Sequence, residues 1–171
     1  MRLLLICSLL LASLPAMAAE KYVVMHAIDE FGVGKIIGVV KLQDSDEGLV
    51  LEPDIGELPR GTHGFHVHEK PSCEAGVKDG RNQAGLAAGG HFDPAGSGKH
   101  EGPAGAGHKG DLPVMEVGSD GNAHFTLLAP KLTIADITGR SLVIHAGGDN
   151  FSDQPNPLGG GGLRIACGLI E

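Results

Sequence analysis

The sequence has no tryptophan, one tyrosine and five phenylalanines among its 171 residues. Basic residues are also scarce, since 13 Lys and Arg stand against 21 Asp and Glu and leave a net charge of −8. This acidic balance argues against general nucleic-acid binding, which depends on basic surfaces. No apolar run approaches the roughly 18 residues that a membrane span needs. The length fits one domain with a core of useful size.

Glycine, proline and histidine are abundant instead. The 28 glycines and 10 prolines together make up about 22% of the chain, which disfavours long helices and favours short strands joined by turns. Nine histidines in a small acidic chain are not explained by packing in a core. The histidines are therefore the first candidates for residues of a functional site.

The first 18 residues have the pattern of a cleavable secretory signal. Arg2 precedes the apolar run 3–11, and the small-residue sequence 16–18 follows as a cleavage site. We therefore expect an exported chain whose mature part, residues 19–171, is one domain. A lipid anchor on Cys7 is the alternative, but this residue lies too early in the segment for that role.

Removal of the signal segment would leave two cysteines, Cys73 and Cys167. In an exported protein such a pair is expected to form a disulfide. A bridge across so long a loop contributes roughly 4–5 kcal/mol in the chain-entropy model. Two buried free thiols are the alternative.

Apolar and β-branched stretches, separated by turns rich in glycine and aspartate, predict strands along most of the chain. They cover residues 22–28, 35–43, 49–51, 61–68, 112–117, 122–128, 141–145 and 163–170. Residues 119–122 contain Asp-Gly and predict a hairpin turn, whereas only 133–138 suggests a helical turn. About eight strands predict an all-β antiparallel barrel or sandwich.

Two long segments, 69–110 and 147–162, lack strand periodicity. Loops longer than about 15 residues in a compact domain are usually functional or disordered. The first is rich in glycine, which suits a chain that wraps closely around a site. A flexible linker is the alternative, but a linker would not need His91, His100 and His108.

The histidines fall into patterns that suit metal binding. On a strand the period of two places His66 and His68 on one face and Phe65 and Val67 on the other. His91, His100, His108 and Asp111 could supply a tetrahedral shell of three nitrogens and one oxygen, which suits Zn²⁺. His145 ends a further apolar run.

Six histidines and one aspartate exceed the needs of one metal, so the sequence predicts two. Imidazole-rich sites accept Cu, Zn, Fe or Ni, and the residues alone do not choose between them. Read singly, the loop histidines could belong to a solvated polar loop, and His145 could be an ordinary strand-end residue.

Five motifs in order resemble those of the copper,zinc superoxide dismutases. They are Gly64–His68, Gly89–Pro94, His108–Leu112, Leu142–His145 and Leu163–Gly168. The resemblance covers nearly all of the mature chain, and the segments 147–155 and 159–162 resemble the bacterial periplasmic branch. It implies an eight-stranded Greek-key barrel with two long functional loops and one intrachain disulfide. It also implies copper and zinc as cofactors, superoxide as substrate, and a periplasmic monomer or homodimer.

The resemblance also implies a role for each matching residue. The copper ligands would be His66, His68, His91 and His145. The zinc ligands would be His91, which is shared, with His100, His108 and Asp111. Asp149 would link His66 to His100, Arg164 would attract and orient the anion, and Cys73–Cys167 would be the family disulfide. Lys78 and Arg81 are candidates for steering the substrate, or else residues of a solvated loop.

Three further histidines are expected outside the metal sites. The odd spacing of His63 from His66 turns its side chain away from them, and His63 resembles a structural histidine of the family, whereas His26 and His124 are expected at surface or strand positions. The rival functions are a copper-binding protein without turnover and a structural β-sandwich. Arg164 and the shared His91 favour the enzyme, because a copper-storage protein needs neither an arginine that guides an anion nor a ligand shared by two metals.

Overall fold

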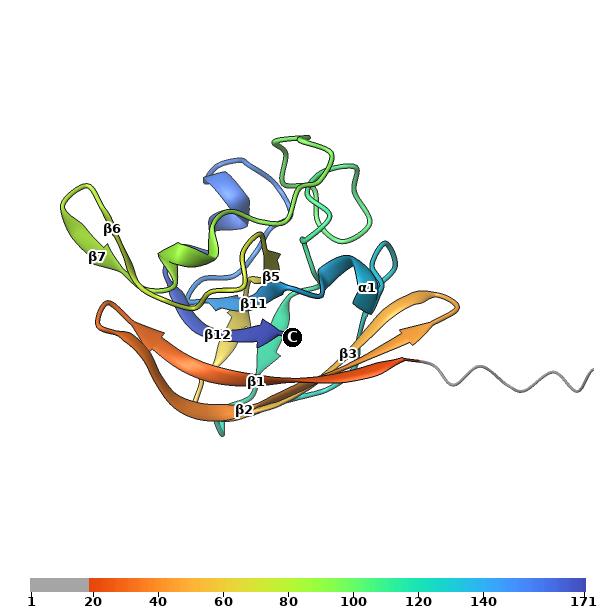
Figure 1. The fold of residues 1–171 in the computed structure, drawn as a ribbon, viewed down its shortest axis with the longest axis horizontal. Helices are drawn as coiled ribbons and strands as arrows, with labels where there is room; N and C mark the ends of the chain where they lie inside the picture. The colour runs from red at the N-terminus through yellow and green to blue at the C-terminus, as the bar shows by residue number, and fades with distance from the viewer. Residues whose placement is uncertain (1–18) are drawn as a thin grey trace, which may run out of the picture.

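Strands dominate the computed structural model, which describes residues 19–171 (Figure 1). The predicted signal segment, with Cys7, lies outside the described residues. The strands are β1 (Glu20–Asp29), β2 (Gly32–Ser45), β3 (Gly48–Ile55), β4 (Gly61–His63), β5 (Phe65–His68), β6 (Gly76–Lys78), β7 (Arg81–Gln83), β8 (Met115–Val117), β9 (Ala123–His124), β10 (Leu127–Ala129), β11 (Arg140–His145) and β12 (Arg164–Ile170). The helical segments are α1 (Ile134–Ile137) and the 3₁₀ turns η1 (Leu86–Ala88) and η2 (Pro157–Gly160). Among these described segments no helix has the length and apolarity to span a bilayer.

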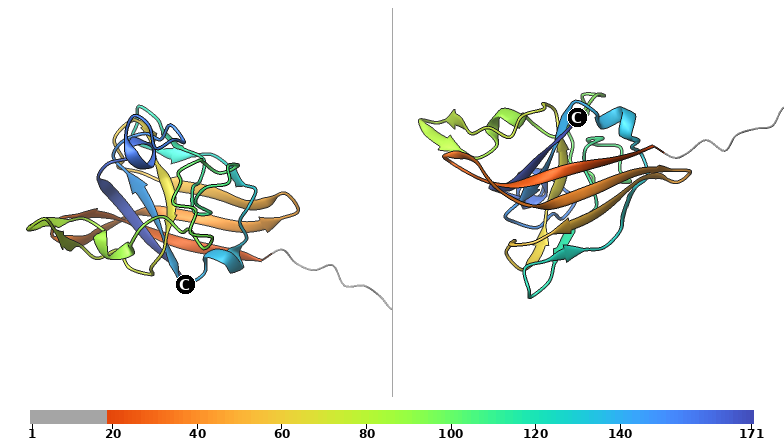
Figure 2. Two further views of the ribbon diagram at one scale, coloured as in Figure 1. Left: turned by 90° about the horizontal axis from the view of Figure 1, so that it is seen from above. Right: turned by 60° about the horizontal axis from the view of Figure 1, so that its bottom comes forward.

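Eight strands form one antiparallel sheet in the order β10-β3-β2-β1-β12-β11-β5, with β9 also paired to β3. The first strand thus lies beside the last, so the chain closes on itself rather than forming a simple meander. The sheet curls, and the long ribbon β1–β2–β3 faces β12, β11 and β5 across the core (Figures 1 and 2). The expected all-β barrel architecture is confirmed.

Alternation of side chains along the strands builds the core. In β3, Leu49, Leu51, Pro53 and Ile55 are buried, while Val50, Glu52 and Asp54 between them are less so. In β1, Val23 and Met25 point inward and Tyr22 is exposed. Burying one such side chain contributes about 1.5–3 kcal/mol, so the alternating strands hold the sheet in its curled form.

The predicted strand 61–68 is in fact two strands, and the break lies at Gly64. Before it β4 pairs with β8, and after it β5 pairs with β11. Gly64 donates its N–H to the Gly147 carbonyl and accepts from the N–H of His145. A Cβ at Gly64 would lie 3.0 Å from Cε1 of His66, so glycine permits this close approach beside a candidate ligand.

Two other local predictions need correction. The turn at 119–122 forms, with Gly121 at φ +79°, but the flanking strands β8 and β9 pair with β4 and β3 and not with each other. The predicted loop 69–110 contains a hairpin, β6–β7, which turns at Asp79 and Gly80. Its three-residue strands are too short to show an apolar alternation. The helical turn at 133–138 is confirmed as α1, which Thr133 caps.

The two long segments lie on the same side of the sheet (Figure 1) and contact each other. The backbone N–H of His100 in the first donates to the carboxylate of Asp153 in the second, at 3.0 Å. The disulfide Cys73–Cys167 forms as expected and ties the first segment to β12 across a sequence separation of 94. The two loops are thus joined to each other, and the first is also joined to β12.

Candidate metal centre

Strand β5 brings the first two histidines to the site. Phe65 and Val67 point into the core, and His66 and His68 point to the opposite side, as the strand period predicts. All four side chains are fully buried. The neighbouring strand β11 ends at His145, where a register shift after Ile144 turns the side chain toward the same place.

A cluster of four imidazoles, from His66, His68, His91 and His145, forms above β5 and β11. One ring nitrogen from each lies within 4.8 Å of the others. The Nε2 atoms of His68 and His145 are 3.3 Å apart, and an isolated β-bridge joins His68 to His91. We call this set the first cluster.

A second cluster shares residues with the first. It contains His66, His91, His100 and Asp111, again with donor atoms within 4.8 Å. Nδ1 of His91 lies 2.9 Å from Oδ1 of Asp111. His108 lies beside this set, because its Nδ1 is 3.4 Å from the same carboxylate oxygen.

Asp149 connects the two clusters through its carboxylate. One oxygen accepts from Nε2 of His66 and the other from Nε2 of His100, both at 2.7 Å. A carboxylate only accepts, so both histidines carry a proton on Nε2 and keep Nδ1 for another partner. The family resemblance implied this link between the two residues, and the hydrogen bonds agree with it.

Several buried side-chain atoms that could bind a metal lack any hydrogen-bond partner within the described chain. They are Nδ1 of His66, His100 and His108, Nε2 of His91, and Oδ2 of Asp111. Leaving a buried polar atom unpaired costs about 1–3 kcal/mol, and native structures normally avoid it. Nδ1 of His100 even lies 2.9 Å from Oδ2 of Asp111 without the alignment of a hydrogen bond. These atoms therefore fit metal ions placed among them.

Burial keeps most of these imidazoles neutral. Desolvation is the main cause that lowers the pKa of His91 to about 4 and that of His145 to about 2, and nearby His66 adds to both shifts. Burial also lowers the pKa of His66 and of His68. A neutral imidazole presents a lone pair, which is the form that binds a metal.

His100 is the exception. Burial alone would lower its pKa, but the carboxylate of Asp111, 2.9 Å from its Nδ1, and the hydrogen bond to Asp149 raise the pKa to about 9. The pKa values of both carboxyls lie well below the usual range, because their contacts with His100, and with His91 or His66, outweigh the effect of burial. Without metal, His100 thus carries a positive charge between two carboxylates.

A cavity of about 200 Å³ opens onto the first cluster. Arg164, His91 and His145 line it together with Lys78, whereas Arg81 does not line it and lies opposite Lys78 in the β6–β7 hairpin. The guanidinium of Arg164 donates to the carbonyls of Gly85 and Gly89. A fixed cation in a cavity that two imidazoles also line can bind a small anion.

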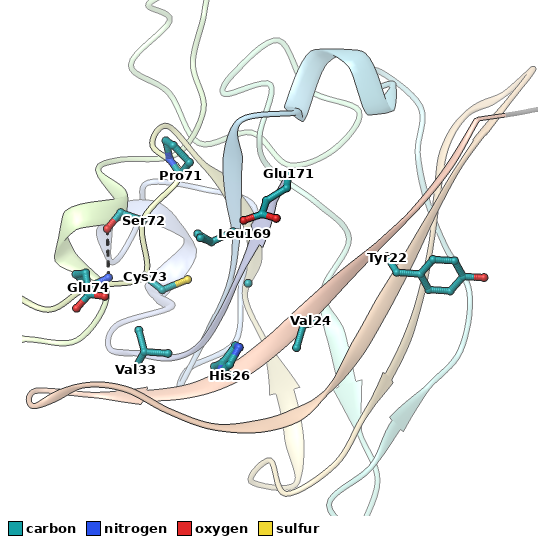
Figure 3. Close-up of a pocket in the computed structure, with 11 residues that line it drawn as sticks. Tyr22, Val24, His26, Val33, Pro71, Ser72, Cys73, Glu74, Leu169 and Glu171 are labelled. Atoms are coloured by element: carbon teal, nitrogen blue, oxygen red, sulfur yellow. Dashed lines mark hydrogen bonds between the residues drawn. The ribbon is translucent and has the colours of Figure 1, made fainter.

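A larger hollow, about 530 Å³, lies elsewhere and contains neither cluster. It runs along β1 beside the segment of Cys73, and Tyr22, Val24 and Leu169 contribute apolar surface to it (Figure 3). None of the candidate ligands lines it. The smaller cavity is therefore the candidate active site.

The other histidines lie outside both clusters, as expected. His63 is buried, and its two ring nitrogens lie 2.7 Å from the carbonyl oxygens of His145 and Pro59. It therefore supports the backbone of a first-cluster residue. His26 contacts the Gly34 carbonyl on β1–β2, and His124 is exposed.

Sequence reasoning did not single out two carboxylates that hold the loop backbone. Asp153 accepts from the N–H groups of His100 and Leu158. Glu69 accepts from the N–H of Gly90, one residue before His91. The position of Glu69 directly after His68 was the only sequence signal for its role.

Comparison with known proteins identifies the family. Residues 36–170 match the copper/zinc superoxide dismutase family. The chain is 48% identical over 157 residues to the copper-zinc superoxide dismutase of Escherichia coli K12, covering 91% of each protein. It is 47% identical over 165 residues to that of Brucella abortus, covering 96% of this chain and 95% of the relative.

Solved structures agree with the sequence comparison. The copper/zinc superoxide dismutase from Brucella abortus superposes with a TM-score of 0.88 at 48% identity, over 90% of this chain and 100% of that one. The monomeric enzyme from Salmonella enterica gives a TM-score of 0.81 at 49% identity, with the same coverage. The shared fold, the two clusters and these identities show that the chain belongs to the copper/zinc superoxide dismutase family.

Proposed function

We propose that the protein converts two superoxide anions and two protons into dioxygen and hydrogen peroxide. The observation that carries this proposal is the sharing of His91 between two donor clusters, one of which opens onto a cavity with a fixed arginine. A storage protein needs neither a shared ligand nor an anion-binding cation.

The two clusters, with His108 beside the second, would supply the ligands for two metals. Copper would be held by His66, His68, His91 and His145, and zinc by His91, His100, His108 and Asp111. The unpartnered buried atoms support this division: Nε2 of His91 belongs with the first set, and Nδ1 of His100 and His108 belong with the second. The ordinary ligand preferences of both metals include imidazole, and zinc also accepts one carboxylate.

Copper bound in the first cluster supplies the one-electron oxidation and reduction of superoxide. Arg164 binds the anion and orients it, because its guanidinium is fixed by two backbone carbonyls and faces the cavity. His91 is positioned for proton transfer: its Nδ1 faces Asp111 on the zinc side, and its Nε2, which has no hydrogen-bond partner within the described chain, would take up a proton and pass it to the substrate.

Lys78 and Arg81 would attract superoxide toward the cavity. Lys78 lines the cavity and Arg81 lies across the same hairpin. The molecule carries a net charge of −8, so a local positive field is needed to offset its general repulsion of an anion. Superoxide dismutase is itself a standard example of such focusing.

We further propose that residues 1–18 direct export to the periplasm and that residues 19–171 form a single domain there. The apolar signal pattern and the Cys73–Cys167 disulfide support this location, because disulfides persist in oxidising compartments. In solution we propose a monomer or a homodimer, which light scattering distinguishes.

Superoxide scavenging by purified protein loaded with both metals tests the function. We expect rapid scavenging, and we expect Arg164→Ile to reduce the rate by roughly tenfold or more, because the anion loses its local cation. Metal content measured on the same samples is the control, since Arg164 is not a proposed ligand. Full copper occupancy without scavenging would contradict the proposal and favour a copper-binding protein.

A further inference from the structure

One guanidinium lies behind the two clusters and contacts three separate segments of the chain. Arg140 is the first residue of β11, the strand that ends at His145. Its side chain is half-buried, and it belongs to neither cluster. Its three contacts each reach a segment that carries candidate ligands.

The first contact is with Phe92, the residue after His91. The guanidinium carbon of Arg140 lies 3.6 Å from the centroid of the Phe92 ring, which is buried. The backbone of Phe92 donates to the Val67 carbonyl and accepts from Gly110, both at 2.8 Å. The stacking on the ring and these two backbone hydrogen bonds together fix the backbone from which His91 extends.

The second contact is with Glu69, the residue after His68. One terminal nitrogen of Arg140 donates to the Glu69 carbonyl at 2.9 Å. Glu69 in turn exchanges two hydrogen bonds with Gly90: its N–H donates to the Gly90 carbonyl, and its carboxylate accepts from the Gly90 N–H. Glu69 follows His68 and Gly90 precedes His91, so this contact joins the two ligand segments.

The third contact reaches the turn between His108 and Asp111. Nε of Arg140 donates to the carbonyl of Asp136 in α1 at 3.2 Å. The carboxylate of the same aspartate accepts from Nζ of Lys109 at 2.7 Å. Lys109 directly follows His108, so Arg140 is linked to this candidate zinc ligand through Asp136 and Lys109.

We propose that Arg140 is a positioning residue that keeps His68 and His91 in fixed relation to each other and to the His108–Asp111 turn. This inference rests on the proposed function of the two clusters. Arginine suits the role because its planar group can stack on a ring and donate in two directions at once. Lysine keeps the positive charge but has no planar fork.

The test compares Arg140→Lys and Arg140→Met with the wild type. Zinc retention is measured against a competing chelator, and the arrangement of the copper ligands is followed by the Cu(II) electron paramagnetic resonance spectrum. We expect both variants to lose zinc affinity by about tenfold or more, as is usual when a residue that orients ligands is removed. We also expect the copper spectrum to change, with Arg140→Lys resembling Arg140→Met.

Thr138→Val is the matched control. Its hydroxyl donates to the Ile134 carbonyl in the same region, so its loss lowers stability without reaching a ligand segment. We expect a lower melting temperature with zinc affinity and copper spectrum unchanged. If Arg140→Met does not fold, Arg140→Lys decides the outcome.

The proposal is overturned if the Arg140 variants that fold retain zinc and give the same copper spectrum as Thr138→Val. Neither readout depends on turnover. A wild type that binds both metals but does not scavenge superoxide would therefore refute the enzymatic function and leave this comparison valid.

Discussion

The carboxylate of Asp149 can serve both clusters because no side chain stands at Gly159. Gly159 has φ +70°, and its backbone exchanges hydrogen bonds with residues 150 and 152 of the same loop. A Cβ there would collide with Oδ1 of Asp149 and lie 2.9 Å from Nε2 of His100. We therefore expect Gly159→Ala to displace Asp149 and weaken metal retention by about tenfold or more, measured by chelator competition.

Gly160→Ala provides the matched comparison. Gly160 has a similar φ of +85°, but a Cβ there would lie 3.8 Å from the nearest atoms, in Asn156. Both variants cost about 1–3 kcal/mol of backbone strain. Equal metal retention in the two would show that the contact with Asp149 has no importance.

Single-residue chemistry was also the level at which the sequence was most informative about the site. The period of two along β5 was sufficient to place His66 and His68 together. The contributions of Arg140 and Gly159 were not predictable, because they depend on carbonyls and carboxylates that come from distant segments. Such contacts leave no periodic pattern in the sequence.

Among the elements, the disulfide secures the loop that holds Arg164. The carbonyls of Gly85 and Gly89, which accept from Arg164, follow Cys73 in that loop. Replacement of Cys73 and Cys167 by alanine should lower the free energy of unfolding of the metal-free protein by about 4–5 kcal/mol. It should also reduce scavenging, since Arg164 loses fixed partners.

Urea unfolding and a superoxide assay measure the two effects separately. An unfolding free energy within about 1 kcal/mol of the wild type would contradict the stabilising role of the bridge. Unchanged scavenging by a folded, fully metal-loaded variant would show that Arg164 does not depend on the tethered loop.

Helix α1 gives a prediction about acid stability. Thr133 and Asp136 form a capping box, and Lys109 also donates to the Asp136 carboxylate. Burial alone would raise the pKa of Asp136, but these hydrogen bonds outweigh it and lower the pKa below the ordinary 3.8. The stabilisation is therefore present above pH 3.8 and is lost as the pH falls through the lower pKa of the folded state.

Asp136→Asn should lower the unfolding free energy of the metal-free protein by about 1 kcal/mol at neutral pH. The difference from the wild type should shrink in acid, because the wild-type carboxyl is then protonated too. Asp46→Asn, which changes an exposed residue, is the control. A difference that stays constant from neutral to acid pH would refute this interpretation of Asp136.

Elements were predicted well where a long apolar or β-branched run forms a single strand, and poorly where the chain changes its pairing partner. β1, β2, β11 and β12 are long enough to show their pattern. The break at Gly64 depends on hydrogen bonds to Gly147 and His145, more than 80 residues away in the chain. The local sequence around Gly64 gives no indication of these distant hydrogen bonds.

For the whole molecule, the distribution of charge decides how superoxide reaches the cavity. The net charge of −8 repels an anion, whereas Arg164 and Lys78, which line the cavity, would attract it under the proposed function. These effects respond to salt with opposite signs. If the overall charge dominates, added salt screens repulsion and the rate rises; if the local cations dominate, the rate falls.

We expect the rate to fall as salt is raised, and we expect Lys78→Gln to reduce it by about twofold or more at low ionic strength. Lys131→Gln removes the same charge from an exposed position that does not line the cavity. Because both variants have the same net charge, a purely global effect would slow them equally. A loss confined to Lys78→Gln, with a weaker dependence on salt than the wild type, would locate the attraction at the cavity, and stopped-flow rates at several salt concentrations measure both quantities.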